Sequence, residues 1–433
     1  MDLLTANDRI GEYPGSFYAG VTEHLAPFPP AEGGIICDVC IVGGGFTGLS
    51  SALHLAQRGY NVRLVEAQRV GFGASGRNGG QVGQGQRLEQ DELEEMVGPD
   101  HARELWRIGM QSVELVRELA ASEEINTPFH PGIAHADHRE RYVEHSRKYV
   151  DHLREHYGYE HVRFLDRDEM REQVRSDAYF GGTLDTRSGH INPLAFALGL
   201  ARKAVSAGAV IHERSRVTWL DQGSKPVVTT ETARITADHV ILACNGYLGD
   251  LQGDVANRVM PINNYIVATE SLGPDGQEKL IRDNIAVADS RFVVNYFRFS
   301  DDHRLLFGGT ESYDWKFPAD IGAMVRRPMT QIFPQLANVR IDQAWGGTLG
   351  ITMNRMPHYA SYGGNILSMS GFSGHGVAMG TLSGQIAAEM ISGQAERFDI
   401  MARVPSPRFP GGVRLRRPLL VLAMLWYSLR DRI

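Results

Sequence analysis

A glycine-rich turn near the start of this 433-residue chain constrains its fold more than any other feature. Its glycines, Gly43, Gly45 and Gly48, have the spacing G-x-G-x-x-G and follow a short apolar run. A helical pattern from Leu49 to Gln57 comes next, and a second apolar run then leads to Glu66. This order is typical of the first β-α-β unit of a dinucleotide-binding fold. In such a unit the helix N-terminus faces a pyrophosphate, and the acid accepts hydrogen bonds from a ribose hydroxyl.

Length and composition limit the class of protein. Because 433 residues exceed what one small core organises, two domains are expected. The hydrophobic content of 42% and the charged content of 22% are ordinary for a globular protein. The net charge of −7 gives no reason to expect nucleic-acid binding. The chain has three cysteines, and residues 1–35 hold no basic segment followed by an apolar one, so we expect a cytoplasmic protein.

Two later glycine-rich segments predict further ligand contacts. The segment Gly71–Gln81 cannot hold regular structure, but it can bring backbone amides close to a ligand. The segment Gly371–Gly376 precedes a helical pattern of small residues, Val377–Ser392. A cofactor gripped from three distant segments fits FAD better than a nicotinamide dinucleotide. This second helix would direct its positive dipole end at an anion such as a reduced flavin, and a protonated His375 would add to the effect.

The second half of the chain predicts an antiparallel sheet. Residues 181–257 contain a helical pattern and apolar strands that suggest a return to the first sheet. Residues 258–340 predict strands at Asn263–Thr269, Phe292–Phe299 and Leu305–Gly309. Alternation along the middle strand indicates two differently used faces. We expect this sheet to cover the cofactor and to face a substrate cavity.

Two other features of the sequence could indicate a site: a pair of histidines that could bind a metal, and an apolar run that could contact a membrane. His152 and His156 have metal-ligand spacing, but no carboxylate or cysteine pattern completes a site. We therefore expect a solvated helix face there and no metal. The apolar run Leu419–Tyr427, flanked by arginines, is too short to span a bilayer. It fits a helix packed on the body or an interfacial membrane contact.

Taken together, the motifs resemble those of the FAD-dependent amine oxidases of the D-amino-acid-oxidase superfamily. The segments that carry the resemblance are residues 37–56, 71–81, 189–194, 245–250, 304–309, 355–357, 371–377, 396–399, 409–412 and 427–432. They cover nearly the whole chain and include the tail, which favours the packed helix over a membrane contact.

The resemblance implies an α/β fold with a Rossmann-like FAD-binding domain of the glutathione-reductase type. It also implies a discontinuous α+β substrate domain built on an antiparallel sheet. The FAD-binding domain is expected in three parts, at residues 1–88, 181–257 and 341–400. The substrate domain is expected at residues 89–180 and 258–340, and residues 401–433 form the C-terminal tail with its packed helix.

The resemblance also assigns residues to FAD. The expected contacts are Gly43, Gly45, Phe46, Thr47 and Gly48 at the pyrophosphate, Glu66 and Ala67 at the ribose, Val217 and Gly246 at the adenine end, Ser75, Asn78, Gly79 and Gln81 towards the flavin, and Gly374, His375, Gly376 and Val377 at the pyrimidine edge. Some relatives attach the flavin covalently, through a cysteine near the position of Ile351 or a histidine just after the Ser75 segment. This chain has neither, since its cysteines precede residue 245 and no histidine lies between residues 55 and 100. Non-covalent FAD is therefore expected.

The reaction that the resemblance implies is oxidation of an amine by hydride transfer to the flavin. Water then hydrolyses the imine, and molecular oxygen is reduced to hydrogen peroxide. A site that lowers the pKa of the amine through desolvation and positive charge needs no dedicated base. The candidates for substrate contact or catalysis are Tyr296, Arg298, Arg355 and His375, with Arg355 binding a substrate carboxylate.

Three functions stay open at this point, and the sequence predicts no oligomeric state. The first is an oxidase of an aliphatic amine, which gives an aldehyde, ammonia and hydrogen peroxide. The second is an oxidase of a cyclic or N-substituted amino acid such as pipecolate, because one scaffold can serve many substrates. The third is a membrane-associated dehydrogenase that passes electrons to a quinone.

Overall fold

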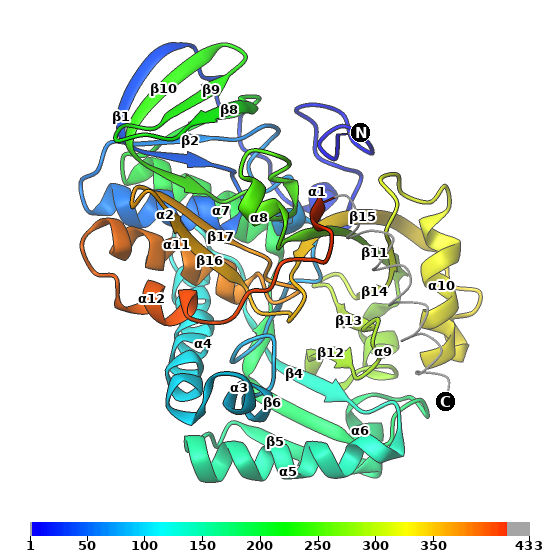
Figure 1. Ribbon diagram of the computed structural model, residues 1–433. Coiled ribbons are helices and arrows are strands. Elements are labelled where there is room, and N and C mark those ends of the chain that lie inside the picture. The colour runs from blue at the N-terminus through cyan, green and yellow to red at the C-terminus, as the bar shows by residue number, and fades with distance from the viewer. Residues whose placement is uncertain (1, 414–433) are drawn as a thin grey trace.

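A largely parallel sheet, here sheet A, forms around the glycine-rich turn in the computed structural model, which describes residues 2–413 (Figure 1). Its strand order is β16-β17-β10-β1-β2-β7, and the hairpin of β8 and β9 pairs with β10. The strands are β1 (Gly33–Val42), β2 (Val62–Val65), β7 (Val210–His212), β8 (Val217–Asp221), β9 (Val227–Thr230), β10 (Ala233–Leu242), β16 (His358–Tyr362) and β17 (Ile366–Ser370). The inner strands from β17 to β7 are all parallel, as the β-α-β pattern predicts.

Helices α2, α7 and α11 lie together along one face of sheet A (Figure 1). The described helices are α1 (Phe17–Val21), α2 (Phe46–Gln57), α3 (Gln90–Val97), α4 (Pro99–Ala120), α5 (Glu140–Tyr157), α6 (Arg167–Gln173), α7 (Pro193–Ser206), α8 (Gly253–Ala256), α9 (Gly273–Glu278), α10 (Ile321–Ile332), α11 (Ala378–Ile391) and α12 (Glu396–Ala402). Small residues let α11 approach α2 closely, since a Cβ atom on Gly384 would lie 2.5 Å from the Ser50 side chain. The run of small residues after Gly376 therefore has a packing role.

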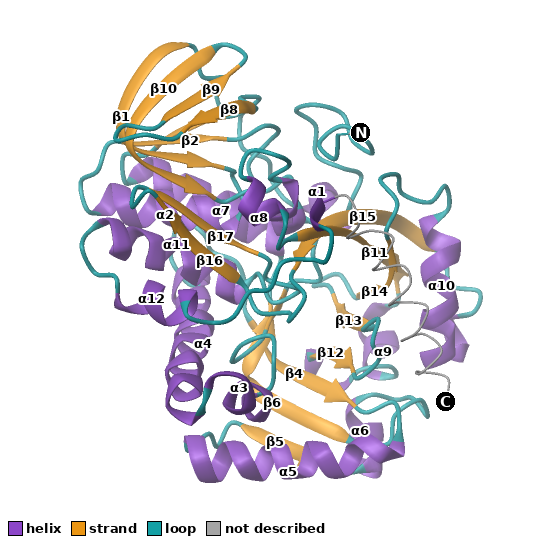
Figure 2. Cartoon of the chain, in the orientation of Figure 1, coloured by secondary structure: helices purple, strands orange, loops and turns teal. Residues whose placement is uncertain are grey.

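Sheet B is mostly antiparallel and lies beside sheet A (Figure 2). Its order is β15-β11-β14-β13-β12-β4-β6-β3, with β5 on β6, and only β4 and β12 pair in parallel. The strands are β3 (Gln81–Val82), β4 (His130–Ala136), β5 (Val162–Leu165), β6 (Gly182–His190), β11 (Met260–Ser271), β12 (Ala286–Asp289), β13 (Tyr296–Phe299), β14 (Arg304–Ser312) and β15 (Ile341–Ile351). Fold class is thus as expected, a mixed α/β fold with a second, largely antiparallel sheet.

The two faces of sheet B pack against different parts of the molecule. Ile266 and Leu306 belong to the same buried cluster as the residues of α2 and α11. Tyr265 and Phe307, their neighbours along the strands, belong to a second cluster with Met329 of α10. One face of the sheet therefore looks towards the glycine-rich loops, and α10 covers the other.

Three strands depart from the expected division of the chain. Strand β3 is Gln81–Val82, β6 begins at Gly182 and β15 spans Ile341–Ile351, so three segments expected in the FAD-binding domain are strands of sheet B. Helix α4, expected in the substrate domain, contributes Leu105 and Val113 to the cluster that holds α2 and α11. We propose domain limits that follow the sheets: β3, β6 and β15 with the substrate side, and α4 with the FAD side.

The strand expected at Phe292–Phe299 is shorter than the alternation predicts. Only Tyr296–Phe299 forms β13. The Asp289 carboxylate accepts hydrogen bonds from the backbone N–H groups of Arg291 and Asn295, at 3.2 and 2.9 Å. This carboxylate folds residues 290–295 into a turn, and the apolar residues before Tyr296 are loop residues.

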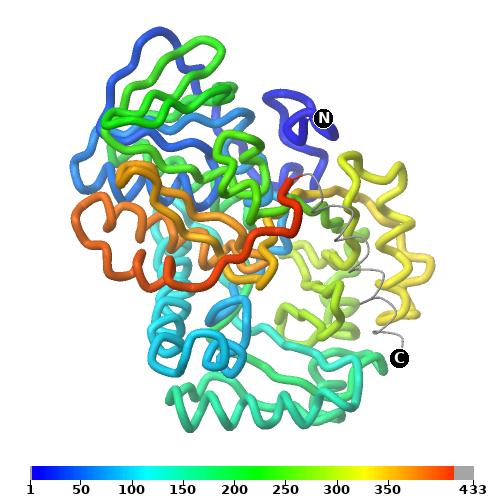
Figure 3. Tube along the Cα trace, in the orientation of Figure 1, coloured from blue at the N-terminus to red at the C-terminus, as the bar shows by residue number. Residues whose placement is uncertain are grey.

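The described part of the C-terminal tail crosses the molecule from α12 to sheet B (Figure 3). The N–H of Phe409 donates to the Asn257 carbonyl at 2.8 Å, and its ring packs with Met260, Ile262 and Ile351. The helix expected at Leu419–Tyr427 lies outside the described residues. Between residues 2 and 413, no helix combines the length and the apolar character that crossing a membrane requires.

Candidate functional site

The glycine-rich turn forms a backbone cradle at the N-terminus of α2. A Cβ atom on Gly48 would lie 1.9 Å from the Gly43 carbonyl oxygen, so helix and strand meet more closely than any larger residue permits. Gly45 is the N-cap and has no side chain to cap the helix. The N–H groups of Phe46, Thr47 and Gly48, in the first turn, have no acceptor within the helix. Such a cradle fits an anion of the size of a pyrophosphate.

Glu66 lies at the end of β2, where the sequence places it. Its Oε2 atom accepts a hydrogen bond from Gly44 N at 2.6 Å, and its Oε1 atom accepts one from Gln68 N at 2.8 Å. Burial raises the pKa of Glu66, and these N–H donors oppose the shift. Ala67 is half-buried beside it. The acid therefore holds the glycine turn while part of it stays accessible to a ligand.

Val217 lies close to Glu66 in space. The N–H of Ser215 donates to the Glu66 carbonyl oxygen at 2.8 Å, which fixes the chain just before β8 against the end of β2. Val217 itself is buried in one cluster with Val42 and Val65. Of the two residues expected at the adenine end, Val217 therefore lies near Glu66, whereas Gly246 is buried against β15.

The second glycine-rich segment runs from α2 to sheet B. Ser75 Oγ accepts a hydrogen bond from Phe46 N at 3.0 Å, so this hydroxyl lies at the N-terminus of α2. Asn78 organises the loop through its Nδ2, which donates to the carbonyl oxygens of Ala74 and Ser75, both at 2.9 Å. Gln81 Nε2 donates to the Val287 carbonyl at 2.8 Å, which ties the loop to β12.

The third segment joins the other two at the N-terminus of α11. Asn245 has a left-handed backbone, φ 46°, and its Oδ1 atom accepts a hydrogen bond from Gly371 N at 2.8 Å. Gly246 follows it and is buried against β15. Gly374 and Gly376 flank His375, and Val377 is the N-cap of α11. Three distant segments thus meet around the carboxyl ends of the sheet A strands, as expected.

The expectation that a protonated His375 adds positive charge is wrong. Burial, and next the nearby Arg87, lower the pKa of His375 to about 4, so the imidazole is neutral at pH 7. Its Nε2 lies 3.2 Å from the Gly85 carbonyl oxygen, which can only accept. Nε2 therefore carries the proton and donates it to the backbone.

Tyr296 and Arg298 lie on β13 but have different roles. The Tyr296 ring packs over Gly79 and Gly308, since a Cβ atom on either glycine would lie within 2.8 Å of it. Its hydroxyl donates to Asn264 Oδ1. The Tyr296 ring therefore faces the second glycine-rich loop.

Arg298, a candidate for substrate contact, is buried and hydrogen-bonded to backbone carbonyls of distant segments. It is 5% exposed. Its Nε donates to the Gly79 carbonyl at 2.6 Å, and its Nη2 donates to the Ile191 carbonyl at 2.9 Å. These bonds between distant segments fix the loop against sheet B.

Arg355 lies with two charged residues that the sequence did not single out, Arg87 and Glu311. The Arg355 backbone is left-handed, φ 65°, and its guanidinium lies 5.7 Å from the centre of the Phe292 ring. Arg87 Nε donates to the Ser373 carbonyl at 3.1 Å, next to the N-terminus of α11. Burial and the positive charge of Arg355 lower the pKa of Arg87. Arg87 is the only cationic side chain between residues 78 and 102, which was the one available sequence signal.

A metal site was not expected, and one surface group has suitable ligand atoms. Glu89, Asp91 and His145 place one ligand atom each within 4.8 Å of the others. His145 Nε2 lies 2.6 Å from Glu89 Oε2, and the side chains of both are about half exposed. At the second candidate, His152 Nε2 lies 3.1 Å from Glu94 Oε1 of α3, and both side chains are about a quarter exposed, so this histidine lies between α5 and α3 and not on a fully solvated face.

Comparison with known proteins agrees with this geometry. Residues 38–390 match the model of the DAO family, described as FAD dependent oxidoreductase. The chain is 41% identical to "Probable oxidoreductase OrdL" of Rhizobium meliloti, over 97% of this chain and 98% of that protein. It is 40% identical to "Gamma-glutamylputrescine oxidoreductase" of Escherichia coli, over 98% of this chain and 99% of that protein.

Solved structures support the fold. Glycine oxidase from Geobacillus kaustophilus superposes with a TM-score of 0.71 at 22% sequence identity, over 83% of this chain and 95% of that one. With a family model that matches most of its length and full-length relatives at 40% identity, the chain belongs to the DAO family of FAD-dependent oxidoreductases.

Proposed function

We propose that the protein oxidises a primary aliphatic amine, with γ-glutamylputrescine as its substrate. The observation that carries this proposal is the 40% identity to the Escherichia coli oxidoreductase across nearly the whole length of both chains. The balanced reaction consumes the amine, molecular oxygen and water, and it yields the aldehyde, ammonia and hydrogen peroxide. A cytoplasmic location stays a prediction.

The residues of the three glycine-rich segments fit FAD, which when bound would accept a hydride from the carbon that bears the amine. We assign the pyrophosphate to the first turn of α2, where the N–H groups of Thr47 and Gly48 have no acceptor within the helix and Ser75 Oγ lies beside the N–H of Phe46. Glu66 and the backbone near Val217 would hold the adenosine. Gly79, Gln81 and the segment Gly374–Val377 would border the flavin, with the positive end of α11 directed at it.

Two arginines would prepare the substrate. The amine must lose its ammonium proton before a hydride can leave its carbon. Arg87, beside the N-terminus of α11, makes the potential there positive, which lowers the pKa of an amine nearby, and burial acts in the same direction. Arg355 would hold the other end of the substrate through its carboxylate. This arrangement supports catalysis without a dedicated base. Tyr296 would form a wall of the site, because its ring is fixed between Gly79 and Gly308.

Peroxide production by the purified holoenzyme tests the function. We expect hydrogen peroxide with γ-glutamylputrescine, and much less with pipecolate, sarcosine or single amino acids. Strong flavin bleaching without peroxide, relieved by a quinone, would favour the dehydrogenase alternative. More peroxide with pipecolate than with γ-glutamylputrescine would favour the alternative of an oxidase for a cyclic amino acid.

Arg355 is the residue that we assign to the substrate carboxylate. For Arg355→Ala, KM for γ-glutamylputrescine should rise about 10- to 100-fold, because a charge-assisted bidentate contact is lost. Steady-state kinetics measure the effect. Arg326→Ala, on the outer helix α10, is the matched control and should leave KM unchanged. An unchanged KM for Arg355→Ala would refute the assignment.

A further inference from the structure

Glu311 is brought to the inner face of sheet B by a β-bulge. Gly308 pairs with Ile266 across β14 and β11, whereas Thr310 pairs with Tyr265, so Gly309 is the extra residue. A bulge of one residue reverses which side chains face inwards. After it, Glu311 pairs with Asn264, on the face that Ile266 shares with the glycine-rich loops. A Cβ atom on Gly309 would lie 2.2 Å from Asn295 Oδ1, so the bulge requires glycine.

The surroundings of Glu311 are cationic but leave the carboxylate available. Its Oε2 accepts a hydrogen bond from the Tyr313 hydroxyl at 3.3 Å. Within residues 2–413 no ion pair with Glu311 is formed. Burial raises the pKa of Glu311, and the charges of Arg355 and Arg87 oppose that shift, which places both guanidinium groups within electrostatic reach. The carboxylate is also close enough to contribute to the raised pKa of Tyr296.

A carboxylate on the inner face of the sheet, with guanidinium groups within electrostatic reach but not paired to it, suits a zwitterionic ligand. An α-amino acid group carries one carboxylate and one ammonium on the same carbon, a separation that neighbouring side chains can bridge. The alternative, in which Glu311 faces the reacting amine, is disfavoured chemically. A carboxylate there would raise the pKa of the ammonium and hold back the neutral amine that hydride transfer needs.

We propose that Glu311 and Arg355 together recognise a free α-amino acid group at the end of the substrate remote from the oxidised carbon, with Glu311 accepting hydrogen bonds from its ammonium. This inference rests on the proposed function and deepens it. The substrate class is then an amide of an aliphatic diamine whose acyl part keeps its α-amino acid group.

Binding of two ligands that cannot be oxidised tests the role of Glu311. γ-Glutamylbutylamide keeps the α-amino acid group and lacks the terminal amine, and glutarylbutylamide also lacks the α-ammonium. Calorimetric titration of the FAD-loaded wild-type protein should give about 10- to 100-fold tighter binding of the first ligand. In Glu311→Gln the two affinities should become equal, through loss on the γ-glutamyl ligand alone.

Glu231→Gln is the matched control, because Glu231 is exposed in the turn between β9 and β10. It should retain the wild-type preference. Equal binding of both ligands by the wild-type protein overturns the proposal, whatever the variant does. So does a Glu311→Gln variant that weakens both ligands alike, which indicates a merely structural carboxylate.

The peroxide assay keeps the two proposals apart. If the wild-type protein binds γ-glutamylbutylamide in a Glu311-dependent way but forms no peroxide from γ-glutamylputrescine, then the proposed oxidase function fails and the recognition site stands. If peroxide forms without that dependence, the recognition site fails and the function stands.

Discussion

His375 is one of several buried histidines that make the stability of this protein sensitive to acid. Burial lowers the pKa of His375 from 6.5 to about 4. Because the folded-state pKa lies below the unfolded value, the unfolded chain binds the proton first, and stability falls as the pH drops from 6.5 towards 4. For His375→Asn, the loss of unfolding free energy between pH 7 and pH 5 should be smaller by at most about 2 kcal/mol. Urea unfolding of both proteins at the two pH values measures the difference.

Comparison between variants isolates His375 from other buried histidines. His54 and His358 also have pKa values lowered to about 4 and contribute equally in both proteins. His161→Asn, at an exposed position, should leave the acid sensitivity at its wild-type value. Identical pH dependence for His375→Asn and the wild type would contradict the burial of a neutral imidazole.

The sequence could identify residues by type and spacing but not by their partners. Gly43, Gly48 and Glu66 were predictable because one local unit of about 25 residues determines their roles. Arg298 was not, because its acceptors, the carbonyls of Gly79 and Ile191, are far away along the chain. The charge of His375 likewise depends on residues far away along the chain, because Arg87 helps to lower its pKa and the Gly85 carbonyl lies 3.2 Å from its Nε2.

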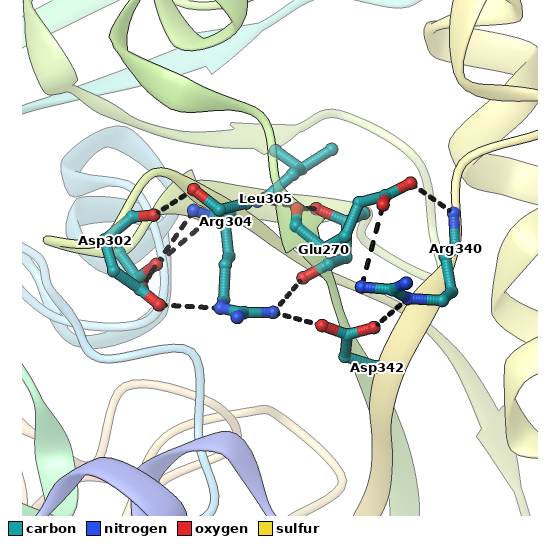
Figure 4. A network of polar contacts seen from close by, with 9 residues as sticks. Glu270, Asp302, Arg304, Leu305, Arg340 and Asp342 are labelled. Carbon is teal, nitrogen blue, oxygen red and sulfur yellow. Dashed lines mark hydrogen bonds and ion pairs between the residues drawn. The ribbon is translucent and has the colours of Figure 1, made fainter.

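At the scale of elements, a ladder of ion pairs joins three strands of sheet B at one end (Figure 4). Asp342 of β15 accepts from Arg304 of β14 at 2.5 Å and from Arg340 at 2.6 Å. The backbone N–H of Arg340 also donates to Glu270 of β11 at 3.0 Å. These two cations hold the pKa of Asp342 below its usual value. The ladder therefore ties the strands that carry Tyr265 and Glu311.

Removing the central carboxylate should loosen this end of the sheet. Asp342→Asn should lower the thermal midpoint by about 2 °C at low salt, and less in 1 M NaCl, because exposed pairs are screened. The difference should also shrink as the pH falls below about 4 and vanish only below the folded-state pKa of Asp342, which is depressed from its ordinary 3.8. Scanning calorimetry at two salt concentrations measures it. The control is Asp151→Asn, which removes an exposed i,i+3 ion pair with Arg154 on α5. It should have no measurable effect on the thermal midpoint. A shift that is independent of salt would contradict an ionic cause.

Helices and strands could be predicted from the sequence where their hydrophobic periodicity runs over many consecutive residues. Their ends were harder to predict. Helix α11 and strand β11 lie close to their expected positions because their patterns span more than one turn or several alternations. The strand at Leu305–Gly309 was expected to end at its second glycine, yet β14 continues to Ser312. Since the bulge at Gly309 depends on pairing with β11, no alternation within β14 could reveal that Glu311 faces inwards. The same dependence on pairing assigns β6 and β15 to sheet B.

At the scale of the molecule, the three glycine-rich segments should make FAD a ligand that stabilises the whole fold. The segments that we assign to it come from α2, the loop to β3 and the N-terminus of α11, which join sheet A to sheet B. A ligand that binds only the folded state stabilises it by about 2.7 kcal/mol at 100 times its dissociation constant. Because we expect no covalent bond, acid precipitation should release all flavin into the supernatant, and FAD added to the apoprotein should raise its thermal midpoint in proportion to log concentration.

Ser75 offers a second test of FAD binding, because its hydroxyl accepts a hydrogen bond from Phe46 N at the helix end to which we assign the pyrophosphate. Ser75→Ala should weaken FAD binding about 5- to 10-fold and shift the stabilisation curve to correspondingly higher FAD concentrations, as expected for loss of about 1 kcal/mol at a helix N-terminus. Ser224→Ala, at an exposed position beyond β8, should follow the wild-type curve. Flavin that stays with the precipitate would refute non-covalent binding. A midpoint that does not respond to FAD would instead refute the assignment of the cofactor to these three segments, since a group that bridges both sheets must couple their unfolding to its own release.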